Sequence, residues 1–180
     1  MYTYISMLRG INVSGQKKIR MEDLRALYES LGLSAVQSYI QSGNVIFNSR
    51  KSELSGLARS ISNAIREYYG FDVPVVIRTC KEIQNVINDN PYLKNGNKDS
   101  SKLHVTFLSD MPTVSAVNQL DPPITGNEEL SVMGREIYLY CPDGYGKTKL
   151  TNAFFEKRLS VAATTRNWKT VNTLLKMATR

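Results

Sequence analysis

The twelve residues at positions 36–47 decide the fold, and they read Val36-Gln37-Ser38-Tyr39-Ile40-Gln41-Ser42-Gly43-Asn44-Val45-Ile46-Phe47. Two stretches rich in β-branched and aromatic residues flank a short polar turn. Gly43 lies in that turn and can adopt the positive φ that tight turns favour. The pattern therefore predicts a β-hairpin with strands at residues 36–40 and 45–47.

The segments outside this hairpin alternate between helix and strand patterns. Apolar residues at helical spacing precede and follow it, and a strand-like segment lies beyond each of those helices. The order is β-α-β-β-α-β, the split arrangement of a ferredoxin-like unit. The expected elements are a strand at residues 2–8, helices at 21–31 and 54–68, and a strand at 73–78.

The second half of the chain repeats much of this order. A short helix at residues 83–87 precedes a polar linker at 91–101. A strand, a short helix and a hairpin about Gly134 follow, at 102–108, 114–120 and 130–140. Helical spacing returns at 150–154 and at 168–178, so a final helix is expected where a fourth strand would complete the repeat.

We therefore expect an α+β protein built from two related units. Residues 1–80 form the ferredoxin-like unit, residues 81–101 a helix and polar linker, and residues 102–180 a second α+β unit with C-terminal helices. The two units can also pack as one domain.

The charge of the chain is concentrated at its carboxyl end. The 180 residues carry 23 Lys and Arg against 16 Asp and Glu, a net charge of +7. Residues 1–146 are neutral, whereas residues 147–180 hold eight basic side chains and the single acid Glu156. A smaller basic group is Arg9, Lys17, Lys18 and Arg20. Such stretches attract polyanions, although they also occur simply as solvated cationic surfaces.

Composition excludes several classes of protein. An apolar content of 42% with 22% charged residues is that of a folded soluble protein, not of a disordered or collagen-like chain. No apolar run approaches the ~18 residues of a membrane span, and residues 1–9 do not form a signal peptide. We therefore expect a cytoplasmic protein.

The metal-binding residue types are too few and too scattered for a metal site. Cys80 and Cys141 are the only cysteines and are expected to be reduced, while the single histidine, His104, is expected on the surface of a strand. We therefore expect no metal and no cofactor.

Two polar clusters lie in the first half, at Arg9-Gly10-Ile11-Asn12 and at Gln41-Ser42-Gly43-Asn44. The first two strands of a ferredoxin-like unit run in the same direction, so both clusters should lie at one end of the sheet. An arginine and several amides there could grip a carboxylate, a phosphate or a base edge. Alternatively, these residues only form the turn and satisfy loop carbonyls.

A third cluster, Gly146-Lys147-Thr148-Lys149, follows a predicted strand. It resembles part of a phosphate-binding loop, but Cys141 stands where the first glycine of that motif is required. A nucleotide triphosphatase is therefore disfavoured. The weaker expectation is a turn that opens a helix and attracts an anion with Lys147 and Lys149.

A fourth cluster runs from Thr164 to Val171 and is expected to begin the last helix, with Thr165 or Asn167 as its N-cap. Trp168 is expected in the core, and Arg166 with Lys169 would favour an anion. The candidate ligand-binding residues over all four clusters are Arg9, Asn12, Lys17, Gln41, Ser42, Asn44, Lys147, Lys149, Arg166 and Asn167.

At these clusters the chain resembles the bacterial domain-of-unknown-function family 1697. The matching stretches lie at residues 8–13, 39–45, 149–151 and 165–171, and Ser14 stands where the family more usually has glycine. The resemblance implies a bacterial cytosolic protein with a ferredoxin-like α+β fold. It implies no activity, because the family has no assigned reaction.

Three functions remain open from the sequence. The first is a binding protein for a phosphate-bearing ligand, with nucleic acid included in that class. The second is an enzyme acting on a small anionic metabolite in a pocket lined by Arg9, Asn12, Gln41 and Asn44, although no catalytic constellation is recognisable. The third is a structural or interaction protein without catalysis.

Overall fold

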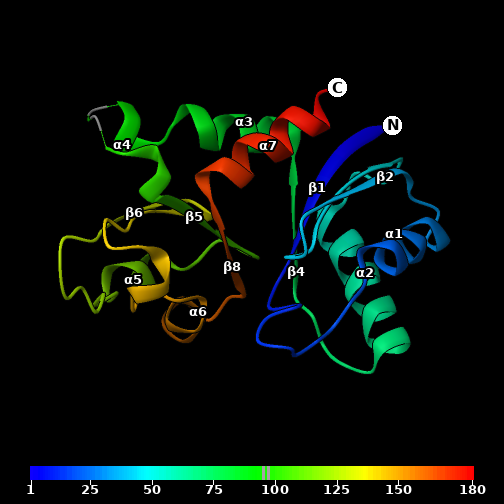
Figure 1. The fold of residues 1–180 in the computed structure, drawn as a ribbon, viewed down its shortest axis with the longest axis horizontal. Helices are drawn as coiled ribbons and strands as arrows, with labels where there is room; N and C mark the ends of the chain where they lie inside the picture. Colours follow the sequence, from blue (N-terminus) through cyan, green and yellow to red (C-terminus); the bar gives the residue numbers. More distant parts are fainter. Residues whose placement is uncertain (95, 97) are drawn as a thin grey trace. The chain divides into compact units, whose positions relative to one another are not determined.

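The computed structural model describes residues 1–94, 96 and 98–180, which divide into two compact units with one four-stranded sheet each (Figure 1). Unit 1 comprises Met1–Gln84 and Leu174–Arg180, and unit 2 comprises Asn85–Thr173. The boundaries fall inside two helices, α3 (Cys80–Asn88) and α7 (Trp168–Ala178). No helix in these residues is both long enough and apolar enough to cross a membrane.

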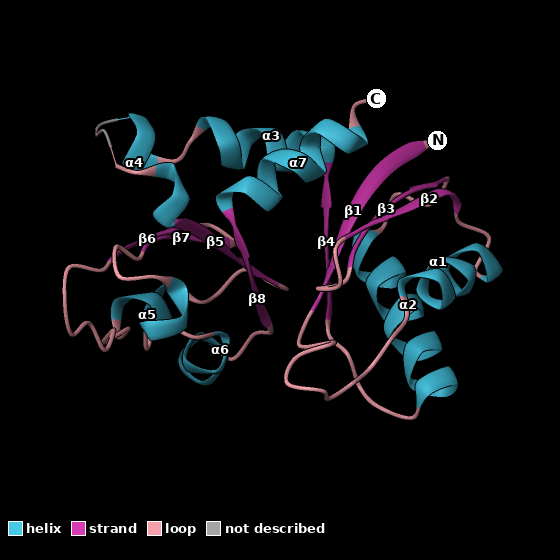
Figure 2. Cartoon of the chain, in the orientation of Figure 1, coloured by secondary structure: helices cyan, strands magenta, loops and turns pink. Residues whose placement is uncertain are grey.

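Unit 1 has the predicted ferredoxin-like topology. Its antiparallel sheet has the strand order β2-β3-β1-β4, so the first strand lies in the centre. Figure 2 shows the two helices of the unit on the same face of this sheet. The elements are β1 (Tyr2–Leu8), α1 (Met21–Ser30), β2 (Ser34–Tyr39), β3 (Asn44–Ser49), α2 (Leu54–Tyr69) and β4 (Val75–Thr79).

The core of unit 1 lies between the sheet and these two helices. Leu57, Ile61 and Ile65 recur every four residues along α2 and are buried, which fixes the face that this helix presents to the sheet. The helix ends at Gly70, where φ is +78° and the backbone N–H bonds to the Arg66 carbonyl at 2.9 Å.

Unit 2 repeats the same topology, with the strand order β6-β7-β5-β8. Its elements are β5 (Leu103–Leu108), α5 (Val114–Asn118), β6 (Glu129–Met133), β7 (Glu136–Tyr140), a short 3-10 helix (Tyr145–Lys147), α6 (Asn152–Leu159) and β8 (Ala163–Asn167). The internal repeat suggested by the sequence is thus a repeat of a complete ferredoxin-like unit.

The expectation that a final helix takes the place of a fourth strand is wrong, and no strand was predicted at residues 164–167. These residues form β8, which pairs with β5 and supplies the missing fourth strand. Consecutive β-branched threonines, Thr164 and Thr165, favour an extended backbone. Helix α7 begins at Trp168, as the helical spacing at 168–178 predicts. Of the two expected N-cap residues it is Asn167 that acts, since its side chain accepts a hydrogen bond from Thr170 N at 2.8 Å.

The predicted polar linker at 91–101 is not wholly irregular. Residues on either side of its middle form α4 (Pro91–Lys94) and a second 3-10 helix (Ser100–Lys102). Asn95 and Asn97, which belong to the same prediction, lie outside the described residues.

The two units correspond residue by residue along their first and fourth strands. The first strand ends with matching bonds, from Leu8 N to the Gly43 carbonyl in unit 1 and from Leu108 N to the Arg135 carbonyl in unit 2, both at 2.9 Å. In the fourth strand, Arg78 lies opposite Ile5 and Arg166 lies opposite Val105.

Candidate functional site

Asn12 organises the loop that follows β1. Its side-chain N–H groups donate to the carbonyls of Ile19 and Gln41 at 2.9 and 2.8 Å, and its Oδ1 accepts from Ile19 N at 2.9 Å. The residue has φ of +54°, which asparagine tolerates better than most residues. The Asn12 amide therefore holds the loop against the tip of the β2–β3 hairpin.

The hairpin tip is closed by Gly43 and Asn44. A Cβ on Gly43 would lie 2.7 Å from Ile11 Cδ1 and 2.8 Å from Leu8 Cβ, so the backbone approaches β1 more closely than a side chain allows. Asn44 is fully buried and donates to the Tyr39 carbonyl at 3.1 Å and to Ser42 Oγ at 3.0 Å. Gln41, by contrast, is exposed.

The two remaining candidates of unit 1 lie at the same end of the sheet. Arg9 directly follows β1, and its backbone N–H bonds to the Pro74 carbonyl at 2.9 Å. Lys17 Nζ donates to the Asp72 carbonyl at 2.6 Å, which ties the loop after β1 to the loop before β4. Unit 1 thus brings six candidate residues together, but Asn12, Lys17 and Asn44 donate to backbone carbonyls there.

The third cluster does not open a helix, so that expectation is wrong. Gly146 and Lys147 belong to a three-residue 3-10 helix, and α6 begins later, at Asn152. The reason is local: Thr151 Oγ1 accepts from Phe154 N at 3.2 Å and caps the helix at that point. Lys147 and Lys149 are exposed in the preceding loop.

Arg166 is a buried residue of β8. Its Nη1 donates to Thr164 Oγ1 at 2.7 Å and to the Thr165 carbonyl at 2.9 Å. Burial lowers the pKa of Arg166 to about 10, which leaves the guanidinium charged at neutral pH. Asn167, the next residue, is exposed and lines a pocket of unit 2.

This pocket, which we name the His104 pocket, has a volume of about 630 Å³. It lies where the start of β5, the end of β8 and the first turns of α7 meet. The lining residues are Ser100, Ser101, His104, Asn167, Trp168, Lys169, Asn172 and Thr173. Lys169 is the one lining residue with a full charge at neutral pH, and the lining contains no carboxylate.

His104 forms one wall of the pocket and is half-buried, contrary to the expected surface position. Its ring stacks on Tyr145 with centroids 4.9 Å apart and planes 24° apart. Within the part of the chain that the structure describes, the enclosed Nδ1 has no hydrogen-bond partner. Burial lowers the pKa of His104.

A line of polar side chains lies on the same face of the sheet. Thr106 Oγ1 is 2.7 Å from Thr165 Oγ1, and Thr165 Oγ1 donates to Asn152 Oδ1 at 2.7 Å. Asn152 is the first residue of α6, so this network joins β5, β8 and the helix. Thr106 is fully buried, and each of these hydroxyl groups is satisfied by its neighbour.

The equivalent positions of unit 1 are more apolar. Tyr4 stands where unit 2 has His104, and Ile77 stands where it has Thr165, according to the matching registers of the strands. Ile77 belongs to the apolar core of unit 1. Thr106, by contrast, has a polar and fully buried equivalent in Ser6. The polar side chains at His104 and Thr165 are therefore the ones that the shared topology does not require, which marks this region as a candidate site.

His104 gives this site a pH dependence that can be measured. The pKa of His104 is lower in the folded chain than its ordinary value of 6.5 in the unfolded chain. The neutral ring therefore makes its full contribution to the free energy of unfolding above pH 6.5, and this contribution is lost as the pH falls through the pKa of the folded state. The variant His104→Phe keeps an aromatic ring against Tyr145 but cannot titrate. We therefore expect its free energy of unfolding to decrease less than that of the wild type between pH ~7.5 and ~5. Urea unfolding of both proteins across this range measures the difference, and a difference that does not change with pH contradicts the expectation.

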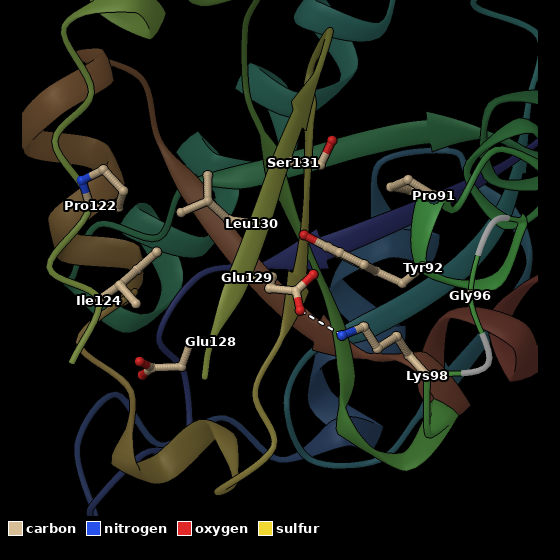
Figure 3. A pocket seen from close by; sticks show the side chains of 10 residues that line it. All are labelled: Pro91, Tyr92, Gly96, Lys98, Pro122, Ile124, Glu128, Glu129, Leu130 and Ser131. Atoms are coloured by element: carbon tan, nitrogen blue, oxygen red, sulfur yellow. Dashed lines mark hydrogen bonds and ion pairs between the residues drawn. The ribbon is translucent and has the colours of Figure 1, made fainter. Parts of the chain in front are cut away.

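A second hollow of unit 2, shown in Figure 3, has a volume of about 760 Å³ and a different electrostatic character. Lys98 Nζ forms an ion pair with Glu129 at 2.6 Å and lies 4.5 Å from the centre of the Tyr140 ring. Glu128 also lines the hollow, and a hydrogen bond with Thr148 is the main cause that lowers its pKa. Because Glu128 and Glu129 are both carboxylates and Lys98 is already paired with Glu129, this hollow does not suit an anionic ligand.

The described residues of the two units do not gather the ligands of a metal centre. Within residues 1–94, 96 and 98–180, no three His, Cys, Asp or Glu side chains lie close enough together to hold an ion. Both cysteines are free thiols, and burial raises the pKa of Cys141 to about 11. A thiol with such a pKa is protonated at neutral pH, whereas the thiolate is the nucleophilic form.

The sequence alone singled out Asn167 but not His104, Ser100 or Asn172. The strand at residues 102–108 alternates Leu103, Val105 and Phe107 with His104 and Thr106, and we assumed that only the first set faces inward. Leu103 and Thr106 are both fully buried, so both faces of this strand are covered. A signal that the sequence does offer is the pair of consecutive β-branched threonines, Thr164 and Thr165, which favours an extended strand before the last helix.

Comparisons with known proteins agree with this fold and supply no reaction. The family described as "Protein of unknown function (DUF1697)" matches residues 1–138. A solved structure described as conserved bacterial protein SP0830 from Streptococcus pneumoniae is similar, with a TM-score of 0.77 and 25% identity over 100% of this chain and 99% of that one. No curated protein matches the chain significantly.

Proposed function

Since the chain belongs to the family described as protein of unknown function (DUF1697), whose description names no activity, we propose from the geometry of unit 2 that the protein binds a phosphate-bearing ligand in the His104 pocket. The observation that carries this proposal is the lining of the pocket. It combines one cation, Lys169, with neutral polar groups and contains no carboxylate.

The electrostatics of the pocket favour an anion. Lys169 is exposed and forms no ion pair with any residue that the structure describes, so its ammonium group remains available. The Asp99 carboxylate, next to Ser100 in the sequence, accepts hydrogen bonds from Ser101 N and Oγ at 2.9 and 2.8 Å. Asp99 thus serves the turn before β5, outside the lining.

The remaining polar groups of the pocket can be counted as donors and acceptors. Asn167 uses its oxygen to cap α7, which leaves its NH₂ group as a donor. Asn172 uses its NH₂ group on the Trp168 carbonyl at 2.8 Å and keeps its oxygen. Ser100 adds a hydroxyl group that can donate. The Asn167 NH₂ group and the Ser100 hydroxyl can therefore donate to a phosphate together with the Lys169 ammonium group.

The size of the pocket favours a small molecule over a nucleic acid. A volume of about 630 Å³ lies within the range of small-molecule sites, roughly 300–1,000 Å³. Nucleic-acid binding usually neutralises several phosphates, whereas one lysine reaches this pocket. A mononucleotide is a suitable probe, since its base could pack beside the rings of Trp168 and His104.

The test is a calorimetric titration of the full chain with adenosine monophosphate, with adenosine as the phosphate-free control. We expect Lys169→Ala to lower the affinity for adenosine monophosphate about tenfold, which is the usual loss for one charge-assisted hydrogen bond. The matched control is Lys176→Ala, which removes the same charge from an exposed position of the same helix outside the pocket and should leave the affinity unchanged.

Two other probes define the ligand class. Inorganic phosphate should compete with adenosine monophosphate for the pocket. A short single-stranded RNA should bind no more tightly per phosphate group than adenosine monophosphate does. Tighter RNA binding that falls steeply with salt would transfer the proposal to the basic carboxyl segment. Equal affinities of the two lysine variants, or no binding of any phosphate compound, would overturn it.

A further inference from the structure

Unit 1 contains a pocket of about 460 Å³ that shares no residue with the six candidates of this unit or with the His104 pocket. Its floor is formed by Leu33, Leu57 and Ile61, all buried members of the core of unit 1. The floor belongs to α2 and to the turn between α1 and β2. We name this cavity the Arg50 pocket, after the arginine at its edge.

Two consecutive cations lie at the edge of this apolar floor. Arg50 and Lys51 follow β3, line the pocket and are exposed. No ion pair involves either side chain among the residues that the structure describes, and the lining contains no carboxylate. An anion bound there would therefore meet two uncompensated positive charges.

The backbone that carries these cations is fixed. Lys51 N donates to Ser49 Oγ at 3.1 Å, and the Tyr4 hydroxyl donates to the Lys51 carbonyl at 2.9 Å. Both ends of the Lys51 peptide are thereby held, although the residue lies in a loop. A fixed loop loses less conformational entropy when a ligand binds, so the site is partly preorganised.

The mouth of the pocket is apolar. Met1 and Leu31 line it and keep 72% and 37% of their surface exposed. Exposed apolar surface that continues into a concave apolar floor is typical of ligand sites.

We propose that the Arg50 pocket binds a small monocarboxylate with an unbranched apolar chain. The chain would lie on Leu33, Leu57 and Ile61, and the carboxylate would meet Arg50 and Lys51 at the edge. The planar fork of the Arg50 guanidinium matches the two oxygens of a carboxylate, and the neighbouring Lys51 adds a second positive charge that attracts the anion. This inference is independent of the phosphate site proposed in unit 2.

Calorimetric titration with decanoate tests the proposal, with decan-1-ol as the uncharged analogue. We expect the double variant Arg50→Ala/Lys51→Ala to bind decanoate at least about tenfold more weakly, with little change for decan-1-ol. Lys157→Ala/Arg158→Ala is the matched control, because it removes the same charge from exposed positions of α6 in unit 2 and should not change decanoate binding.

A second variant tests the apolar floor. Ser60 is exposed on α2 and lines the pocket, so Ser60→Phe should fill it without disturbing the core and should weaken both decanoate and decan-1-ol. Circular dichroism verifies that each variant is folded, and unchanged binding of adenosine monophosphate separates this result from the site in unit 2. Absence of decanoate binding to the wild type, or equal binding to all variants, would overturn the proposal.

Discussion

Replacing Gly43 by alanine is expected to lower the free energy of unfolding by ~2–4 kcal/mol, as strain from a positive φ adds to overpacking. Gly43 has φ of +78°, and an added Cβ would lie within 3 Å of both Leu8 Cβ and Ile11 Cδ1. Both neighbours are buried, and Leu8 N is bonded to the Gly43 carbonyl at 2.9 Å. The hairpin tip therefore cannot move away without breaking the end of the β1 ladder.

Gly70→Ala provides the matched control for this prediction. Gly70 has the same φ of +78°, but an added Cβ would meet no atom within 4 Å. It should cost only the strain of the left-handed conformation, roughly 1 kcal/mol. Urea unfolding followed by circular dichroism measures both values, and similar losses at the two positions would show that the close approach at Gly43 is not a constraint.

The first unit was predictable because its local patterns and its topology agree. The hairpin at residues 36–47 and the helices on either side leave few ways to bury two apolar helix faces, and the ferredoxin-like order is one of them. The structure confirms this order, with β1 between β3 and β4. Gly70 and the four-residue spacing of Leu57, Ile61 and Ile65 also fixed the extent of α2 correctly.

The second unit was harder to predict because polar residues lie at inward positions. A strand of sequence Ala163-Thr164-Thr165-Arg166-Asn167 has no apolar alternation, so the sequence predicts no strand before the helix that begins at Trp168. Thr165 is stabilised there by contacts with Thr106 and Asn152, which lie 59 and 13 residues away in the sequence. Local patterns carry no information about such long-range partners.

The same limit applies to the candidate sites. The short polar motifs marked the loop of Asn12 and the tip of the hairpin, and the strand order required them to lie at one end of the sheet. What a motif cannot tell is whether its amides face a ligand or the backbone. In unit 1 the Asn12 side chain bonds to backbone carbonyls and to the Ile19 N–H, and Asn44 donates to the Tyr39 carbonyl and the Ser42 hydroxyl, which gives both residues a structural role.

This structural role predicts a large effect for Asn12→Ala, with a loss of ~2–4 kcal/mol for three side-chain hydrogen bonds and roughly 1 kcal/mol more for alanine at positive φ. The loop that ends at Ile19 would detach from the Gln41 carbonyl, although the backbone bond from Asn12 N to the Lys17 carbonyl at 3.2 Å would remain.

Asn12→Gly separates the two causes, because glycine adopts the φ of +54° without strain but makes none of the side-chain hydrogen bonds. We therefore expect urea unfolding to rank the wild type above Asn12→Gly and Asn12→Gly above Asn12→Ala. If both variants are as stable as the wild type, the amide does not hold the loop, and Asn12 regains its place among the candidate ligand-binding residues. If the predicted order is found, the Asn12 side chain serves to hold the loop against the hairpin, and the His104 pocket and the Arg50 pocket remain the candidate ligand sites.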